Sequence, residues 1–202
     1  MPITTLFLDI GGVLGTNGWD TAARRRAAAH FGFDFEEFNA RHKRLFGLYE
    51  TGHLTLPEYL KGAVFHTPRP FTTADFLDFI REQSAAWPDN IAFVRALKAR
   101  HGLKVFAVNN EGRELNEHRL ATFAFGDLFD ATVSSCYVGM RKPDPRLYRL
   151  AADLAQTHPA RILVIDDRPE FTELAAALGF QALRYESLPQ LQAALSDTHQ
   201  LQ

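Results

Sequence analysis

Several polar residues in this chain of 202 residues have types that can catalyse group transfer, and they stand beside apolar runs. A carboxylate at the tip of a buried strand can act as a nucleophile, a nearby lysine can offset the charge of a transferred group, and further carboxylates can hold a divalent cation. In chain order the candidates are Asp9 with the turn Gly11-Gly12, the pair Asn109-Asn110, Lys142 within Arg141-Lys142-Pro143-Asp144-Pro145, and the pair Asp166-Asp167. Together they predict a catalytic site built from segments that are far apart in the sequence.

Short apolar runs are predicted to form strands that are buried on both faces, at 5–10, 104–108, 131–135, 161–166 and 180–185. Helical patterns separate the later runs. Alternation of strands and helices predicts a mainly parallel sheet with right-handed crossovers, and therefore an α/β, Rossmann-like three-layer core. Ligands of such sheets bind beyond the carboxyl ends of the strands, which is where Asp9, Asn109 and Asp166 fall.

The segment after Lys142 carries the local signals of a helix that packs on this sheet. Asp144 is a good N-cap, and proline suits the first helical position, which Pro145 would occupy. One apolar stripe is expected to face the sheet, formed by Leu147, Leu150, Ala151 and Leu154.

Residues 16–87 interrupt the alternation with a helical pattern that contains no convincing strand. Thr55-Leu56-Pro57-Glu58 spells a capping box, and Thr72 is placed to open another helix. The phenylalanines between Phe31 and Phe79 are expected to form a separate small core. The sequence thus predicts a catalytic core of residues 1–15 and 88–202 and an inserted helical cap of residues 16–87.

Composition narrows the function classes. The formal net charge is −2, so no electrostatic excess favours nucleic acid or an anionic membrane, and no apolar run has the length of a membrane span. Cys136 is the single cysteine, and the amino-terminal residues lack the pattern of a signal peptide. These features favour a cytoplasmic protein that acts on a small molecule, with its oligomeric state left open.

The series of motifs resembles the haloacid dehalogenase-like (HAD) hydrolase superfamily, whose members are mostly magnesium-dependent phosphatases. An insertion directly after the first strand is similar to the helical cap of one large subgroup, so the resemblance covers nearly the whole chain. It implies hydrolysis of a small phosphorylated metabolite through an aspartyl-phosphate on Asp9, with Mg²⁺ as cofactor.

The resemblance also implies a role for each motif. Mg²⁺ would be held by Asp9, by Asp166 and by the main-chain oxygen of Gly11, with Asp167 supporting the site through water. Lys142 would offset charge at the phosphate. Hydrogen bonds to the phosphate would come from the turn Gly11-Gly12, the side chain of Asn109 and the backbone N–H of Asn110.

One departure concerns proton transfer. Phosphatases of this superfamily usually carry a second aspartate two residues after the first, and this chain has Gly11 there. A positioned general acid or base contributes about 10²–10⁴ in rate, so esters with poor leaving groups would suffer most. Acyl, aryl or sugar-1-phosphates need less protonation of the leaving group. Glu111 is a candidate substitute proton donor.

Three alternatives stay open. A dehalogenase would attack carbon without metal, although relatives of that kind carry Tyr or Phe where Gly11 stands, together with an arginine in the cap. A phosphonate-cleaving enzyme would need a cap lysine, Lys43 or Lys61, to reach the site. A degenerate member would bind a phosphorylated ligand without turnover. Gly11 and Asn109 together favour this alternative, because Asn109 stands where the family usually has serine or threonine.

Other polar residues have simpler interpretations. The histidines show no metal-binding spacing, so His30, His42, His66 and His101 are interpreted as ordinary structural residues. The run Arg24-Arg25-Arg26 is interpreted as a solvated helix face. The insertion residues proposed to contact substrate are Asn17, Trp19, Asp20, Tyr49, Glu50 and Lys61.

Overall fold

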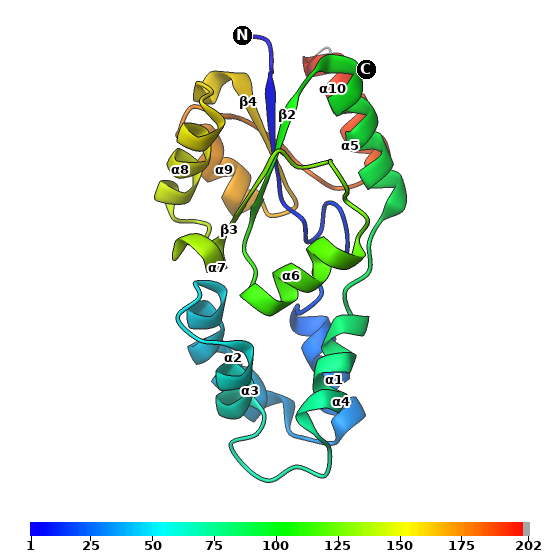
Figure 1. Cartoon of the computed structure of the whole chain (residues 1–202), viewed down its shortest axis with the longest axis vertical. Coiled ribbons are helices and arrows are strands. Elements are labelled where there is room, and N and C mark those ends of the chain that lie inside the picture. Colours follow the sequence, from blue (N-terminus) through cyan, green and yellow to red (C-terminus); the bar gives the residue numbers. More distant parts are fainter. Residues whose placement is uncertain (200–202) are drawn as a thin grey trace.

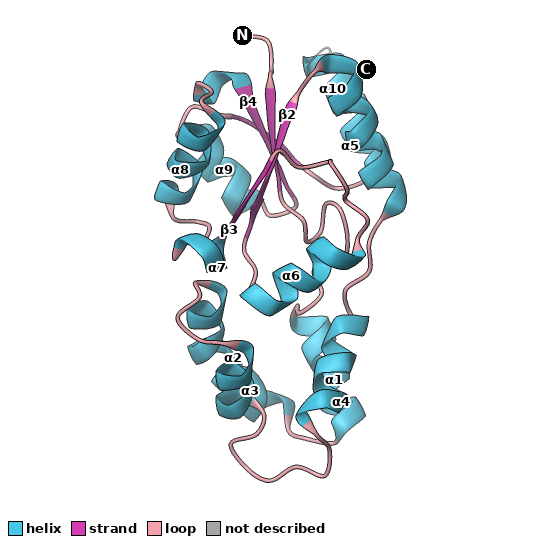
Figure 2. Ribbon diagram, in the orientation of Figure 1, coloured by secondary structure: helices cyan, strands magenta, loops and turns pink. Residues whose placement is uncertain are grey.

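The computed structural model describes residues 1–199, and its centre is a five-stranded parallel sheet (Figure 1, Figure 2). The strands are β1 (Thr5–Leu8), β2 (Lys104–Asn109), β3 (Ala131–Ser134), β4 (Ile162–Asp166) and β5 (Gln181–Arg184), in the spatial order β3-β2-β1-β4-β5. The predicted parallel α/β sheet is therefore confirmed. β1 ends earlier than predicted because the Ile10 carbonyl turns away to accept hydrogen bonds from the N–H groups of Val13, Leu14 and Gly15.

Helices cover both faces of the sheet, which makes three layers. On one face α5 (Pro88–His101) and α10 (Leu188–His199) pack against Leu6 and Leu8 of β1. On the other face α8 (Pro145–Ala155) and α9 (Pro169–Ala177) pack against Phe7. Successive side chains of a strand point to opposite faces, so the uninterrupted apolar run of β1 supplies both cores.

The helix after Lys142 forms as predicted, with one error in its buried stripe. Asp144 caps α8, and Ala151 is fully buried. Leu154, however, is 57% exposed. The buried face is centred on Tyr148, Ala151 and Ala155, because small alanines let the helix approach the sheet closely on that side and leave Leu154 at the edge.

Four helices lie between β1 and α5, beyond the carboxyl ends of the strands (Figure 1). They are α1 (Thr21–Phe31), α2 (Phe35–Glu50), α3 (Leu56–Ala63) and α4 (Thr73–Glu82). The predicted capping box at Thr55 is formed, and Thr72, predicted to open a helix, is the N-cap of α4 and forms a second capping box with Asp75. The helices share an apolar cluster of their own that includes Phe38 and Phe76, as predicted from the phenylalanines.

The remaining elements are short or connect the strands. They are α6 (Arg113–Thr122), α7 (Ser135–Val138) and the 3-10 turn Pro159–Arg161. Within the described part of the chain, every helix falls short of the length and apolar character needed to cross a membrane.

Candidate active site

The first and last of the sequence motifs meet because β1 and β4 are parallel neighbours. Leu8 pairs with Ile165, so Asp9 and Asp166 lie side by side at the carboxyl edge of the sheet. Lys142 lies between them, with its Nζ 3.1 Å from Asp9 Oδ1 and 2.5 Å from Asp166 Oδ2. Its side chain is only 1% exposed. The chain thus buries a cation between two carboxylates that are 157 residues apart.

Burial controls the electrostatics of this cluster. Desolvation raises the pKa of Asp9 to about 7; Lys142 opposes that rise, while Asp166 and Asp167 add to it. Burial alone would lower the pKa of Lys142, but Asp9 and Asp166 hold it above its ordinary value. Lys142 is therefore charged, and Asp9 needs further positive charge nearby to be ionised throughout the neutral range.

The donor set fits a hard divalent cation. Asp9, Asp166 and Asp167 each offer an oxygen, and these oxygens lie within 4.8 Å of one another. Asp167 Oδ1 is buried without a hydrogen-bond partner, and burial raises the pKa of this carboxyl. The carbonyl of Gly11 accepts no hydrogen bond from the described residues. Mg²⁺ prefers oxygen ligands, and a bound cation would supply the partner that a buried, unpaired oxygen needs.

The two neighbouring aspartates differ in how many of their oxygens are occupied. Asp166 Oδ2 accepts from Lys142, and Asp166 Oδ1 accepts from the backbone N–H of Arg168 at 3.0 Å. Asp167 Oδ2 accepts from the side-chain amide of Asn17 at 3.2 Å, while its Oδ1 remains unpaired. Asp166 is thus engaged in holding Lys142, and Asp167 has the unpaired oxygen.

Gly12 makes the approach of Asp167 possible. Its φ is +73°, and a Cβ atom at this position would overlap the Asp167 carboxylate. A residue with a side chain would meet both a backbone penalty and a clash. The second glycine of the turn is therefore required by the packing of the carboxylate cluster.

Gly11 has no such backbone constraint, because its φ is not positive. A Cβ built on Gly11 would lie 2.9 Å from Asn17 Oδ1 and 3.4 Å from Arg119 Nη1. Arg119 is 2% exposed, and its Nε lies 3.3 Å from Oε2 of Glu111. The space beside Gly11 is thus filled by an amide and a guanidinium, with the Glu111 carboxylate next to them.

The two asparagines at the carboxyl end of β2, Asn109 and Asn110, have different surroundings. The Asn110 side chain donates to the Lys142 carbonyl at 2.9 Å and accepts from the Lys142 N–H at 2.8 Å. The Asn109 amide instead donates to Asn116 Oδ1 at 3.4 Å. Asn110 therefore holds the backbone that carries the lysine, and a hydrogen bond from Asn109 to a phosphate stays a prediction.

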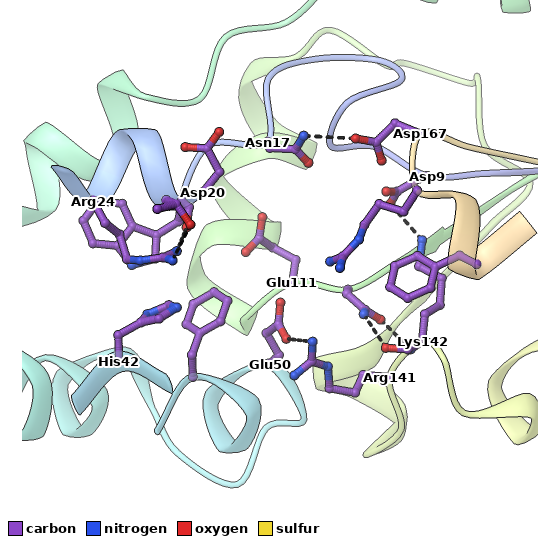
Figure 3. A pocket seen from close by; sticks show the side chains of 16 residues that line it. Asp9, Asn17, Asp20, Arg24, His42, Glu50, Glu111, Arg141, Lys142 and Asp167 are labelled. Carbon is purple, nitrogen blue, oxygen red and sulfur yellow. Dashed lines mark hydrogen bonds and ion pairs between the residues drawn. The ribbon is translucent and has the colours of Figure 1, made fainter. Parts of the chain in front are cut away.

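A cavity of about 460 Å³ opens above this cluster and is closed from the other side by the inserted helices (Figure 3). Its core side includes Asp9, Asn110, Glu111, Arg141, Lys142 and Asp167. Its insertion side includes Asn17, Trp19, Asp20, Arg24, His42 and Glu50. Tyr49 belongs to the apolar cluster of the insertion instead. Among the described residues, Lys43 and Lys61 are exposed and do not line the cavity.

Glu50 and Arg141 connect the two sides of the cavity. Glu50 is the last residue of α2, and Arg141 directly precedes Lys142. The distance between Glu50 Oε2 and Arg141 Nη2 is 3.0 Å. Glu50 is 6% exposed, and burial raises its pKa to about 7 although Arg141 opposes the rise. A carboxyl whose pKa lies near neutrality thus connects the inserted helices to the loop that carries Lys142.

The model of the family described as haloacid dehalogenase-like hydrolase matches residues 3–179. The chain belongs to this family. The hydrolase is 26% identical over 202 residues to drimenol cyclase drtB of Aspergillus calidoustus, covering 96% of the chain and 36% of that relative. It is 28% identical over 127 residues to (S)-2-haloacid dehalogenase 1 of Pseudomonas sp. (strain CBS-3), covering 62% of the chain and 55% of the relative.

Two further similarities concern phosphate chemistry. The hydrolase is 33% identical over 84 residues to phosphatase MT3486 of Mycobacterium tuberculosis, covering 41% of the chain and 39% of that relative. The HAD family enzyme bt-2542 of Bacteroides thetaiotaomicron, solved in complex with magnesium and inorganic phosphate, has the same fold, with a TM-score of 0.77. The two chains are 20% identical, and the match covers 94% of the hydrolase and 98% of that enzyme. The hydrolase therefore spans roughly a third to a half of the length of these curated relatives.

Sequence reasoning missed some of the residues that line the cavity of the hydrolase. Arg24 was expected on a solvated face, but it is 8% exposed, while its neighbours Arg25 and Arg26 are exposed. The helical spacing to the buried residues Ala27 and Ala28 could have identified Arg24, because residues three and four apart share a face. His42, interpreted as structural, also lines the cavity.

Proposed function

We propose that this hydrolase is a magnesium-dependent phosphatase of a small phosphorylated metabolite and acts through an aspartyl-phosphate on Asp9. The observation that carries the proposal is the buried Asp9 carboxylate, held against Lys142 beside two further aspartates. The similarity to phosphatase MT3486 supports phosphate-ester hydrolysis as the reaction. The magnesium and phosphate bound by bt-2542 support Mg²⁺ as the cofactor and a phosphoryl group as part of the substrate.

The metal would be held by Asp9, Asp167 and the Gly11 carbonyl. This differs from the sequence-based expectation, which assigned the second carboxylate to Asp166. The reason for the change is that both oxygens of Asp166 already accept hydrogen bonds, whereas Asp167 Oδ1 has none. A bound Mg²⁺ would neutralise charge on the phosphoryl group and on Asp9.

The side chains then divide the reaction between them. The Asp9 carboxylate attacks phosphorus and the ester P–O bond breaks; Lys142 stabilises the charge on the phosphoryl oxygens. Glu111, buried beside the space at Gly11, protonates the leaving oxygen and afterwards takes a proton from the water that cleaves the aspartyl-phosphate. Burial raises the pKa of Glu111 although the Arg119 guanidinium opposes the rise, and a raised pKa favours the protonated form that the first step needs.

Helices α1 to α4 would serve as the cap that selects the substrate. They provide one wall of the cavity, and the Glu50–Arg141 ion pair ties that wall to the loop of Lys142. A wall of this kind excludes water from the reacting groups when the substrate is bound.

The test measures hydrolysis of 4-nitrophenyl phosphate with Mg²⁺ and with a chelator. We expect turnover that requires Mg²⁺ and that Asp9→Asn abolishes, with exposed Asp153→Asn as the control. Glu111→Gln should slow alkyl phosphates far more than the nitrophenyl ester, whose leaving group needs no proton. Full activity of Asp9→Asn would assign the nucleophile elsewhere.

The dehalogenase relative keeps carbon–halogen cleavage as the second candidate. Release of halide from a 2-haloacid that continues in the presence of chelator would support it over the phosphatase. Imine chemistry on a phosphonate is disfavoured, because Lys142 is the one lysine lining the cavity among the described residues and two carboxylates hold it charged. Ligand-dependent stabilisation without hydrolysis of any ester would instead indicate a degenerate binding protein.

A further inference from the structure

The guanidinium of Arg24 forms part of the cavity wall at the end away from Asp9 and Lys142 (Figure 3). It is held rigidly by neutral oxygens: Nη1 donates to the Trp19 carbonyl at 2.6 Å, Nε to Asn39 Oδ1 at 3.3 Å, and Nη2 to Thr21 Oγ1 at 3.0 Å. A buried arginine with these partners is pre-organised, but its charge is not neutralised.

The other cations of the cavity wall differ from Arg24 in this respect. Arg141 pairs with Glu50, Lys142 with two aspartates, and Arg168 with Glu170. Within the described residues, Arg24 has no carboxylate at ion-pair distance. Desolvating an unpaired charge is costly, so a buried guanidinium beside a cavity indicates an anion that enters the cavity.

That anion is not supplied by Asp20, the nearby carboxylate of the same wall. Asp20 Oδ1 accepts from the Ala23 N–H at 2.7 Å and caps α1, and Asp20 is exposed to solvent. It therefore acts on Arg24 only at longer range.

His42 adds a neutral donor beside Arg24. Trp19 Nε1–H donates to the Tyr59 hydroxyl at 2.9 Å, and that hydroxyl lies 2.8 Å from His42 Nδ1. Tyr59 is completely buried, so its own hydrogen needs an acceptor, and Nδ1 is the one at hand. His42 therefore carries its hydrogen on Nε2. Burial lowers the pKa of His42 to about 3, and Arg24 adds to this effect, so the ring stays neutral.

We propose that Arg24 and His42 bind a carboxylate of the substrate, so that the hydrolase acts on small phosphate esters that carry a second acidic group. This inference rests on the proposed phosphatase function and names its substrate class. One cation and one neutral N–H match the single charge and two oxygens of a carboxylate. A second phosphate, with a larger charge, would leave negative charge without a partner.

The test measures binding by calorimetry in Mg²⁺ buffer, with two phosphonates of the same shape. The first is 4-carboxybenzylphosphonate, and the second is its uncharged carbamoyl counterpart; carboxyalkyl and carbamoylalkyl phosphonates of increasing length extend the comparison. We expect the carboxylate to bind at least about tenfold more tightly in one of these pairs, as for a hydrogen bond to a charged group. Equal affinity in every pair would overturn the inference with the wild-type protein alone.

Variants then assign the preference to Arg24. Arg24→Gln should remove most of the preference for the carboxylate, whereas Arg25→Gln, an exposed neighbour on the same helix, should keep it. A preference that survives in a folded Arg24→Gln protein would place the carboxylate elsewhere and refute the assignment.

Hydrolysis separates the inference from the function on which it rests. Turnover of 4-nitrophenyl phosphate with no carboxylate preference would leave the phosphatase proposal standing and refute the role of Arg24 and His42. A carboxylate preference without hydrolysis of any phosphate ester would support the binding site and refute the phosphatase.

Discussion

Replacing Glu50 by glutamine should change how the stability of the protein depends on pH. Burial holds the pKa of Glu50 at about 7 in the folded chain, against an ordinary value of 4.5. The folded state therefore binds the proton more tightly than the unfolded state. Stability from this group is complete below pH 4.5 and is lost as the pH rises through 7. Glutamine has no proton to lose.

The size of the effect follows from the two pKa values. Their difference of about 2.5, at about 1.4 kcal/mol for each unit, corresponds to roughly 3.5 kcal/mol of unfolding free energy. The wild-type protein should lose this amount relative to Glu50→Gln between pH 4.5 and pH 7, and the difference should then stay constant. Arg141, which loses its partner in the variant, has a side chain that is 40% exposed and remains hydrated.

Urea denaturation at a series of pH values from 4 to 9, in chelator, measures the effect. Subtracting the variant from the wild type cancels titrations that both proteins share. The matched control is Glu36→Gln, because Glu36 is on the same helix with a side chain that is 77% exposed. A difference between wild type and Glu50→Gln that does not vary with pH would refute the claim that burial dominates at Glu50.

Three further experiments test the geometry of the candidate active site. Gly12→Ala should lower the unfolding free energy by roughly 1–2 kcal/mol, because a φ of +73° is unfavourable for alanine. It should also weaken Mg²⁺ binding, because the added Cβ would displace Asp167, and an unchanged Mg²⁺ affinity would contradict this. Asn110→Ala removes two hydrogen bonds to the Lys142 backbone and should lower kcat about tenfold with little change in the pH profile of kcat. An unchanged kcat would show that the position of Lys142 does not depend on these hydrogen bonds. In thermal denaturation, Asp167→Asn should lose the stabilisation by Mg²⁺ that Asp166→Asn retains, and the reverse result would restore the assignment of the metal to Asp166.

The sequence alone was sufficient to predict the sheet and the meeting of its motifs. Apolar runs long enough for buried strands, separated by helices, allow few arrangements other than a parallel sheet, and parallel strands bring their carboxyl ends to one edge. Asp9 and Asp166 could therefore be brought together from strand ends alone. The capping boxes at Thr55 and Thr72 were predictable for a different reason, since they depend only on residues three apart.

Tertiary structure alone decided which polar groups find partners. Asp166 and Asp167 are adjacent and identical in type, yet both oxygens of Asp166 accept hydrogen bonds while one oxygen of Asp167 is unpaired. The difference depends in part on Lys142, which lies 24 residues before Asp166 and contacts it only in the folded chain. Leu154 is exposed although it belongs to the predicted apolar stripe, since burial depends on what packs opposite a helix face. Hydrophobic periodicity predicts which residues are buried in the core. The pairing of charges depends instead on contacts between segments that are distant in the sequence, and those contacts exist only in the folded chain.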